Sequence, residues 1–233
     1  MRILLPIAAL LLAAGCSEAG DGGPGQGASS SQTPSTSSSA SPKPPTTSPV
    51  AAGPPAQGAP ITAVIGWIEA GKPVDVAGFH TADRDGKTTQ LQNGVAFTTP
   101  SGKTTCMTGM TTVDDGQLAC LTELTDGPAK PATAGPDGQW IPGWIDYPGD
   151  SLTVGGMHGD PGGFGYGKGP ALSYGQRLKF GDYQCRTDQV GLFCVNYAHQ
   201  SGARISDAGV LPFGCLREVA PSGDELVGLK FGC

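Results

Sequence analysis

Charged residues are scarce in this chain of 233 residues, and basic residues are fewer than acidic ones. Lysine and arginine number 14 against 20 aspartates and glutamates, which gives a formal net charge of −6. A nucleic-acid-binding protein needs a basic surface that neutralises phosphates. The composition therefore argues against nucleic acid as a partner.

Long segments without glycine or proline are also missing. The chain contains 38 glycines and 21 prolines, and from residue 61 onward the longest stretches free of both have ten residues, 117–126 and 192–201. An average helix has about 11 to 12 residues, so we expect no long helix here. Short β-branched and aromatic runs between turn residues are typical of strands. We predict an all-β fold of short antiparallel strands, with strands at 63–68, 95–98, 118–121, 140–145, 183–186 and 192–197.

A single apolar segment at the N-terminus is too short to span a membrane. It covers residues 3–14, follows Arg2 and includes Pro6, whereas a membrane-spanning helix needs about 20 apolar residues. A basic residue followed by a short apolar run and small residues is typical of a cleavable secretory signal peptide. We predict that residues 1–15 are such a signal peptide.

Cys16 follows this segment directly. The residues Leu12-Ala13-Ala14-Gly15 before it resemble the lipobox of bacterial lipoproteins, in which the cysteine thiol accepts a diacylglyceryl group and becomes the mature N-terminus. We predict lipidation of Cys16, which implies a protein anchored to the outer face of the cell membrane. The alternative is an ordinary signal peptide cut elsewhere, which leaves Cys16 as a free thiol.

Residues 17–60 are rich in proline, serine and glycine and contain no aromatic residue, leucine or isoleucine. Such a segment cannot bury enough apolar surface to offset its chain entropy, so we predict a disordered tether. Its composition is also typical of O-glycosylated stalks. A folded domain is predicted at 61–233.

Seven cysteines are an odd number, and lipidation of Cys16 leaves six in the predicted domain. On the oxidising side of a membrane, six cysteines indicate disulfides, for which fifteen connectivities exist. The chain has no C-x-x-C pair, the usual zinc spacing, so we predict no metal and no cofactor. Two pairs flank short turn-rich stretches, and the third pair is what remains. The predicted bridges are Cys106–Cys120, Cys185–Cys194 and Cys215–Cys233.

A partial internal sequence repeat suggests that the domain has two similar halves. The residues Gly66-Trp67-Ile68-Glu69 precede His80, and Gly143-Trp144-Ile145-Asp146 precede His158; a neighbouring cysteine pair follows each time. The hypothesis is a duplication in which each half contributes a tryptophan-containing strand and a disulfide-linked hairpin. The alternative is chance similarity in a glycine-rich chain.

Two further motifs carry a resemblance to known proteins. One is Phe97-x-Thr99-Pro100-Ser101-Gly102, which leads to Cys106; the other is Leu172-x-Tyr174-Gly175, which leads through Cys185, Gly191, Cys194 and Asn196 to His199. With the lipobox and the tether, the chain resembles actinobacterial cell-envelope lipoproteins of the LppI kind over essentially its full length. The resemblance implies an envelope location and a fold class, and no chemistry.

Two motifs that suggest enzymes lack their usual context. Gly149-Asp150-Ser151-Leu152 matches the GDSL string of a hydrolase class, but the chain has no Asp-x-x-His to complete the triad. Residues 162–169 match part of a phosphate-binding loop, but Gly169 stands where magnesium needs Ser or Thr. We interpret 162–169 as a glycine-rich surface loop whose Phe164 and Tyr166 either contact a ligand or fold onto the core.

Three histidines, His80, His158 and His199, are the side chains that ordinarily titrate near neutrality. Asp83, Asp85 and Asp160 lie near them in sequence, but no closely spaced ligand set accompanies them, so a structural role is favoured. The tryptophans at 67, 140 and 144 suit either core packing or stacking on sugar rings. Candidate ligand contacts are Trp67, Trp144, Phe164 and Tyr166.

The sequence favours a non-enzymatic, lipid-anchored domain that binds or scaffolds a cell-wall component or an envelope protein. One alternative is a hydrolase of envelope lipid or glycan that uses Ser151 or an Asp/His pair. The other is a carrier of apolar ligands, which requires an open apolar interior.

Overall fold

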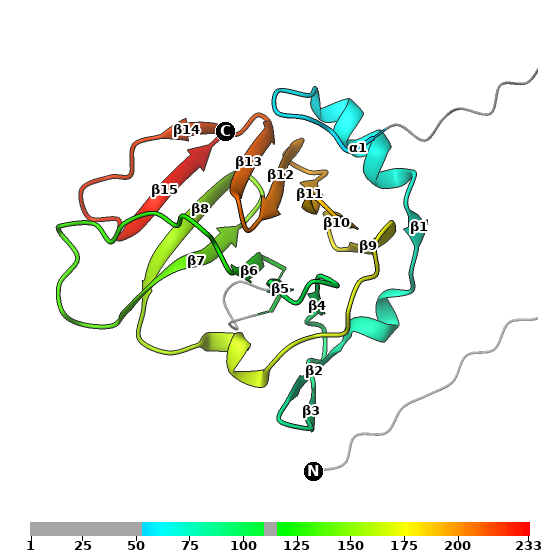
Figure 1. Cartoon of the computed structure of the whole chain (residues 1–233), viewed down its shortest axis with the longest axis horizontal. Helices are drawn as coiled ribbons and strands as arrows, with labels where there is room; N and C mark the ends of the chain where they lie inside the picture. Colours follow the sequence, from blue (N-terminus) through cyan, green and yellow to red (C-terminus); the bar gives the residue numbers. More distant parts are fainter. Residues whose placement is uncertain (1–52, 110–115) are drawn as a thin grey trace, which may run out of the picture. The chain divides into compact units, whose positions relative to one another are not determined.

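Alternating apolar residues and frequent turns arrange the chain into two antiparallel sheets (Figure 1). The computed structural model describes residues 53–109 and 116–233, which belong to the unit Pro49–Cys233. The predicted signal peptide, Cys16 and most of the predicted tether lie outside the described residues.

The described residues form one α-helix, two 3-10 helices and fifteen strands. The helices are α1 (Ile61–Glu69), η1 (Val76–Phe79) and η2 (Gly162–Tyr166). The strands are β1 (Lys72–Pro73), β2 (Thr81–Arg84), β3 (Lys87–Gln90), β4 (Ala96–Thr98), β5 (Thr104–Met107), β6 (Leu118–Thr122), β7 (Gln139–Tyr147), β8 (Ser151–His158), β9 (Gln176–Phe180), β10 (Tyr183–Asp188), β11 (Gly191–Asn196), β12 (Ser201–Ser206), β13 (Gly209–Gly214), β14 (Arg217–Val219) and β15 (Val227–Gly232).

The six-stranded sheet has the order β1-β9-β10-β11-β12-β13, and the seven-stranded sheet has the order β14-β15-β8-β7-β6-β5-β4. The strands β2 and β3 form a separate hairpin. Every strand pair is antiparallel except β1 with β9. The prediction of a mostly antiparallel β fold is therefore confirmed, and β4, β6, β7, β10 and β11 lie where five of the six strands were expected.

The main core takes side chains from the facing sides of both sheets. Because side chains alternate along a strand, Leu192 and Cys194 of β11 enter this core while Phe193 and Val195 lie on the opposite face. Representative core residues are Leu178, Cys185 and Ile205 from the six-stranded sheet and Cys106, Leu118, Ile145 and Leu152 from the seven-stranded sheet.

Each sheet also buries part of its outer face under another segment. On the six-stranded sheet, α1 lies beside β11 to β13 (Figure 1). It covers the outer side chains of β11 and β13. On the seven-stranded sheet, the cover comes from β2 and η2. The first cluster comprises Val64, Trp67, Ile68, Phe193, Val195 and Phe213, and the second comprises Ala82, Ala96, Met107, Ala119, Trp144 and Phe164.

The helix α1 replaces the strand predicted at 63–68, so that prediction was wrong. Val64, Trp67 and Ile68 are all buried. Their spacing of three and four residues places them on one face of a helix, whereas a strand would turn Trp67 and Ile68 to opposite faces. The β-branched composition suggested a strand, but the spacing of the buried residues requires the helix.

Two arginines of the six-stranded sheet bind the C-terminal end of α1. Arg186 donates a hydrogen bond to the Trp67 carbonyl, and its guanidinium lies 3.8 Å from the centre of the Trp67 ring. Arg177 Nε donates to the Gly71 carbonyl at 2.9 Å. Cations are favourable there because the last carbonyls of a helix lack partners within the helix.

The three predicted disulfides are present. Cys106 lies directly opposite Cys120, and Cys185 directly opposite Cys194, with Cα–Cα distances of 4.0 and 4.1 Å. Both bridges are buried in the main core. The bridge between Cys215 and Cys233 is more exposed and joins the residue after β13 to the last residue of the chain, across 4.8 Å.

The proposed duplication is corrected in one respect. Trp67 lies in a helix and Trp144 in strand β7, so the two tryptophan motifs adopt different structures. The disulfide-linked hairpins do correspond, because each places a directly opposed cysteine pair in the same core.

The glycine-rich segment 162–169 lies close against the backbone of β4. A Cβ atom added at Gly169 would lie 2.1 Å from the carbonyl carbon of Ala96, which only glycine avoids. The predicted surface loop is therefore partly a packed layer. Phe164 is buried beneath it, while Tyr166 is 52% exposed.

Candidate functional site

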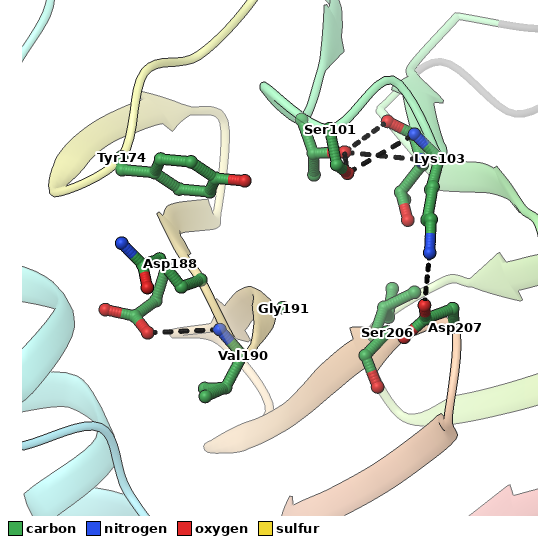
Figure 2. A pocket seen from close by; sticks show the side chains of 12 residues that line it. Ser101, Lys103, Tyr174, Asp188, Val190, Gly191, Ser206 and Asp207 are labelled. Atoms are coloured by element: carbon green, nitrogen blue, oxygen red, sulfur yellow. Dashed lines mark hydrogen bonds and ion pairs between the residues drawn. The ribbon is translucent and has the colours of Figure 1, made fainter.

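A small cleft lies where turns from both sheets meet (Figure 2). One side is the turn between β4 and β5, from the seven-stranded sheet. The other sides are the segment before β9 and the turns β10–β11 and β12–β13, from the six-stranded sheet. The cleft has a volume of about 120 Å³.

Glycines let the chain turn tightly around this cleft. Gly102 and Gly191 have positive φ angles of 75° and 137°, which β-carbon-bearing residues rarely adopt. At Gly191 a Cβ atom would also lie 2.6 Å from the Ile205 carbonyl oxygen. The floor of the cleft therefore depends on the close approach of β11 and β12.

Hydroxyl groups organise the β4–β5 turn. Thr99 Oγ1 lies 3.1 Å from the Ser101 hydroxyl and accepts a hydrogen bond from the Thr104 amide at 3.2 Å. Ser101 is exposed at the cleft, whereas Thr99 and Thr104 are buried. The buried hydroxyl thus holds the turn, and the Ser101 hydroxyl stands at the rim.

An ion pair connects the two sheets across the cleft. Lys103 Nζ donates to the Asp207 carboxylate at 2.5 Å (Figure 2). This hydrogen bond raises the pKa of Lys103 and lowers the pKa of Asp207. Both side chains are about half exposed, so the pair orders the rim and contributes little stability.

The opposite wall carries an aromatic ring and a carboxylate. Tyr174 is 47% exposed and extends from above Asp188 toward the Ser101 side of the cleft (Figure 2). Asp188 accepts a hydrogen bond from the Val190 amide at 3.2 Å. The segment before β9 is fixed by Thr187, whose buried hydroxyl donates to the Leu172 carbonyl at 2.9 Å.

The four residues predicted as ligand contacts lie away from this cleft, and three of them are buried. Trp67 is 7% exposed under Arg186, and Trp144 is 5% exposed between His158 and Phe164. Phe164 is 9% exposed. The three buried rings belong to the apolar clusters on the outer faces of the two sheets, and Tyr166 is the one that faces solvent.

The three histidines occupy separate places. His80 Nδ1 donates to the Gly94 carbonyl at 2.7 Å, and the His199 amide donates to the Asn196 side chain at 3.1 Å. His158 stacks on Trp144 with ring centres 3.5 Å apart, and burial lowers its pKa.

The hydroxyl of Ser151 donates to the neighbouring Asp150 carboxylate at 3.1 Å. Within 53–109 and 116–233, no three His, Cys, Asp or Glu side chains are placed to hold a metal ion. In the same ranges, no helix has the length and apolarity needed to cross a bilayer.

This cleft was not predicted as a site from the sequence, although two of the sequence motifs contribute residues to the cleft walls. The motifs Thr99-Pro100-Ser101-Gly102 and Tyr174-Gly175 were noted separately, and they contribute residues to the same cleft. Asp188 and Asp207 carried no signal in the sequence, because nothing local indicates that these two turns meet. No family model matches the chain, and no similar protein was found among curated proteins or solved structures.

Proposed function

We propose that the protein is a lipid-anchored binding protein of the cell envelope, held at the outer face of the membrane through Cys16 by the tether at 17–60. Its β domain binds a ligand without chemical conversion. The observation that carries the binding function is the cleft formed by turns of both sheets, with Tyr174, Asp188 and Lys103 at its rim.

The number of cysteines supports the anchored location. The three disulfides use all six cysteines of the domain, so Cys16 is the seventh and has no partner left within one chain. Three disulfides are also typical of a protein that matures outside the cytoplasm.

The filled core between the two sheets favours binding at the surface over carriage of an apolar ligand in the interior. The facing sides of the sheets are filled by side chains that include fully buried Tyr147, Phe97 and Leu172. The cleft, by contrast, is open to solvent, and eight of its twelve lining residues are polar or charged. A small polar group of a larger envelope molecule fits this arrangement.

Mass spectrometry of the protein purified from membranes tests the anchor. We expect an N-terminus at Cys16 that carries acyl chains, and release of a Cys16→Ser variant into the medium. A lipid-free Cys16 in the membrane-purified protein contradicts the anchored location. Ester hydrolysis that disappears in Ser151→Ala contradicts a purely binding role.

Binding to isolated cell envelopes tests the domain. We expect Cys16→Ser protein to sediment with envelopes and a Tyr174→Ala variant to sediment less. Tyr166→Ala is the matched control, because Tyr166 is similarly exposed and lies outside the cleft. Equal sedimentation of all three forms, or no sedimentation, contradicts binding through the cleft.

A further inference from the structure

We propose that the cleft binds one uncharged, polyhydroxylated ring, such as a terminal sugar residue of a larger glycan. This inference rests on the proposed binding function and names its ligand class. It follows from the charge balance, the hydrogen-bonding groups, the exposed ring and the size of the cleft.

One pair of opposite charges at the rim of the cleft is already neutralised. Lys103 is paired with Asp207, and the Asp188 carboxylate accepts a hydrogen bond from the Val190 amide. An anionic ligand would have to displace Asp207 from Lys103 to be neutralised. A neutral ligand makes its hydrogen bonds without disturbing this pair.

The cleft offers donors and acceptors that suit hydroxyl groups. One oxygen of the Asp188 carboxylate accepts from Val190, which leaves the second oxygen for a ligand hydroxyl. Gln189 is exposed at the same turn and supplies both an amide donor and a carbonyl acceptor. Ser101 supplies a hydroxyl from the other side. A ring that carries several hydroxyls uses such mixed partners, because each hydroxyl both donates and accepts.

Tyr174 supplies the apolar part of the site. Its half-exposed ring stands beside Asp188 at the entrance to the cleft (Figure 2). A sugar ring has an apolar face of C–H groups that stacks on an aromatic ring while its edge hydroxyls form hydrogen bonds. A carboxylate beside the aromatic ring provides both interactions at once.

The volume limits how much of a ligand enters. About 120 Å³ is well below the roughly 300–1,000 Å³ of pockets that enclose a whole drug-sized molecule. The cleft therefore takes one ring, and the rest of a longer glycan stays in solvent. We expect a dissociation constant on the order of 1 mM for a single methyl glycoside, given the affinity that a ring of this size reaches.

The experiment is an amide NMR titration of the full chain carrying Cys16→Ser. The probes are the methyl glycosides of glucose, galactose, mannose and N-acetylglucosamine; inorganic phosphate and tetramethylammonium serve as charged comparators. We expect at least one glycoside to shift the amides of Ser101, Tyr174 and Gly191, and to do so more strongly than either ion.

Variants locate the interaction. Tyr174→Ala weakens binding by about tenfold because the stacking face is lost, whereas Tyr174→Phe stays within about threefold. Asp188→Asn keeps the acceptor for the Val190 amide and weakens binding about fivefold, because a charged acceptor becomes a neutral one. Tyr166→Ala leaves the affinity unchanged.

The outcomes separate the ligand class from the proposed function. If an ion shifts the cleft amides and no glycoside does, the cleft binds but the saccharide class is wrong. If glycosides shift amides elsewhere, or Tyr174→Ala and Tyr166→Ala behave alike, this cleft is not the sugar site. A further outcome is that no probe shifts the amide signals of the cleft while Tyr174→Ala still reduces sedimentation with envelopes. The proposed binding function then stands, and the proposal of a single neutral ring as the ligand is wrong.

Discussion

The outer faces of the two sheets are covered in different ways, although their inner faces are built alike. Each sheet contributes one directly opposed, buried cysteine pair to the shared core. On the six-stranded sheet the cover is a separate helix, α1, which inserts Trp67. On the seven-stranded sheet the buried tryptophan, Trp144, belongs to the sheet itself, and a glycine-rich segment lies over it.

The two similar Gly-Trp-Ile motifs therefore adopt different secondary structures and bury their side chains differently. In α1, Trp67 and Ile68 both face the six-stranded sheet, because adjacent helical residues on one apolar side are buried together. In β7, Trp144 points to the outer face and Ile145 to the main core. The residues beyond the motif decide which structure forms.

Truncating the two tryptophans tests this comparison most strongly. We expect Trp67→Ala and Trp144→Ala each to lower the free energy of unfolding by about 3–5 kcal/mol, because a large buried side chain is lost. Hydrogen exchange will differ between them: Trp67→Ala exposes the amides of α1, whereas Trp144→Ala exposes those of β6 to β8. The partly exposed Trp140, changed to alanine, is the control with a smaller loss. Identical exchange patterns in both variants contradict the distinction.

The disulfides give the next largest effect. Replacing Cys106 and Cys120 together by alanine, or Cys185 and Cys194 together, lowers the free energy of unfolding by about 2–5 kcal/mol in each case. In the native protein, a mild thiol reductant reduces Cys215–Cys233 first, because thiol attack requires access and the other two bridges are buried. Alkylation and mass spectrometry show the order; early reduction of a buried bridge contradicts it.

Glycine-to-alanine changes examine the cover of the seven-stranded sheet. Gly169→Ala forces a Cβ atom against the Ala96 backbone and lowers the free energy of unfolding by about 1–3 kcal/mol. Gly165→Ala is the matched control in the same segment, because its Cβ meets Pro161 only at an ordinary contact distance of 3.4 Å. Equal denaturant midpoints for the two variants mean that the segment does not pack on β4 as described.

The smallest expected effect is a pH dependence of the free energy of unfolding. It arises at His158, which stacks on Trp144 at the outer face of the seven-stranded sheet. Burial lowers the pKa of His158 in the folded protein, so the unfolded chain binds the proton first as the pH falls. The free energy of unfolding therefore decreases below about pH 6.5, and this decrease is absent in His158→Gln. Urea midpoints at about pH 7.5 and pH 5.5 measure it, with His199→Gln as the control. A decrease that persists in His158→Gln assigns it to another group.

Local patterns predicted much of the fold. Five strands were found from short apolar runs between turns, and two cysteine pairs were found because hairpin partners lie close in sequence. The third pair, Cys215–Cys233, was predicted as the one that remained. The helix α1 was missed because its β-branched residues favour strands, and only the sheet beneath it shows which side is buried. The cleft was missed because its walls come from four segments far apart in the chain.

The sequence by itself determined the mostly antiparallel strands and the two hairpin disulfides, because short apolar runs, turns and hairpin proximity act over a few residues. With those two pairs assigned, the third disulfide was the pair that remained. It also contains the residues that resemble a signal peptide and a lipobox, on which the proposed anchor at Cys16 rests. Only the tertiary structure decided that Trp67 is buried beneath Arg186, and that Lys103 reaches Asp207 although 104 residues separate them. Such contacts depend on how two sheets face each other, and no local pattern encodes that arrangement.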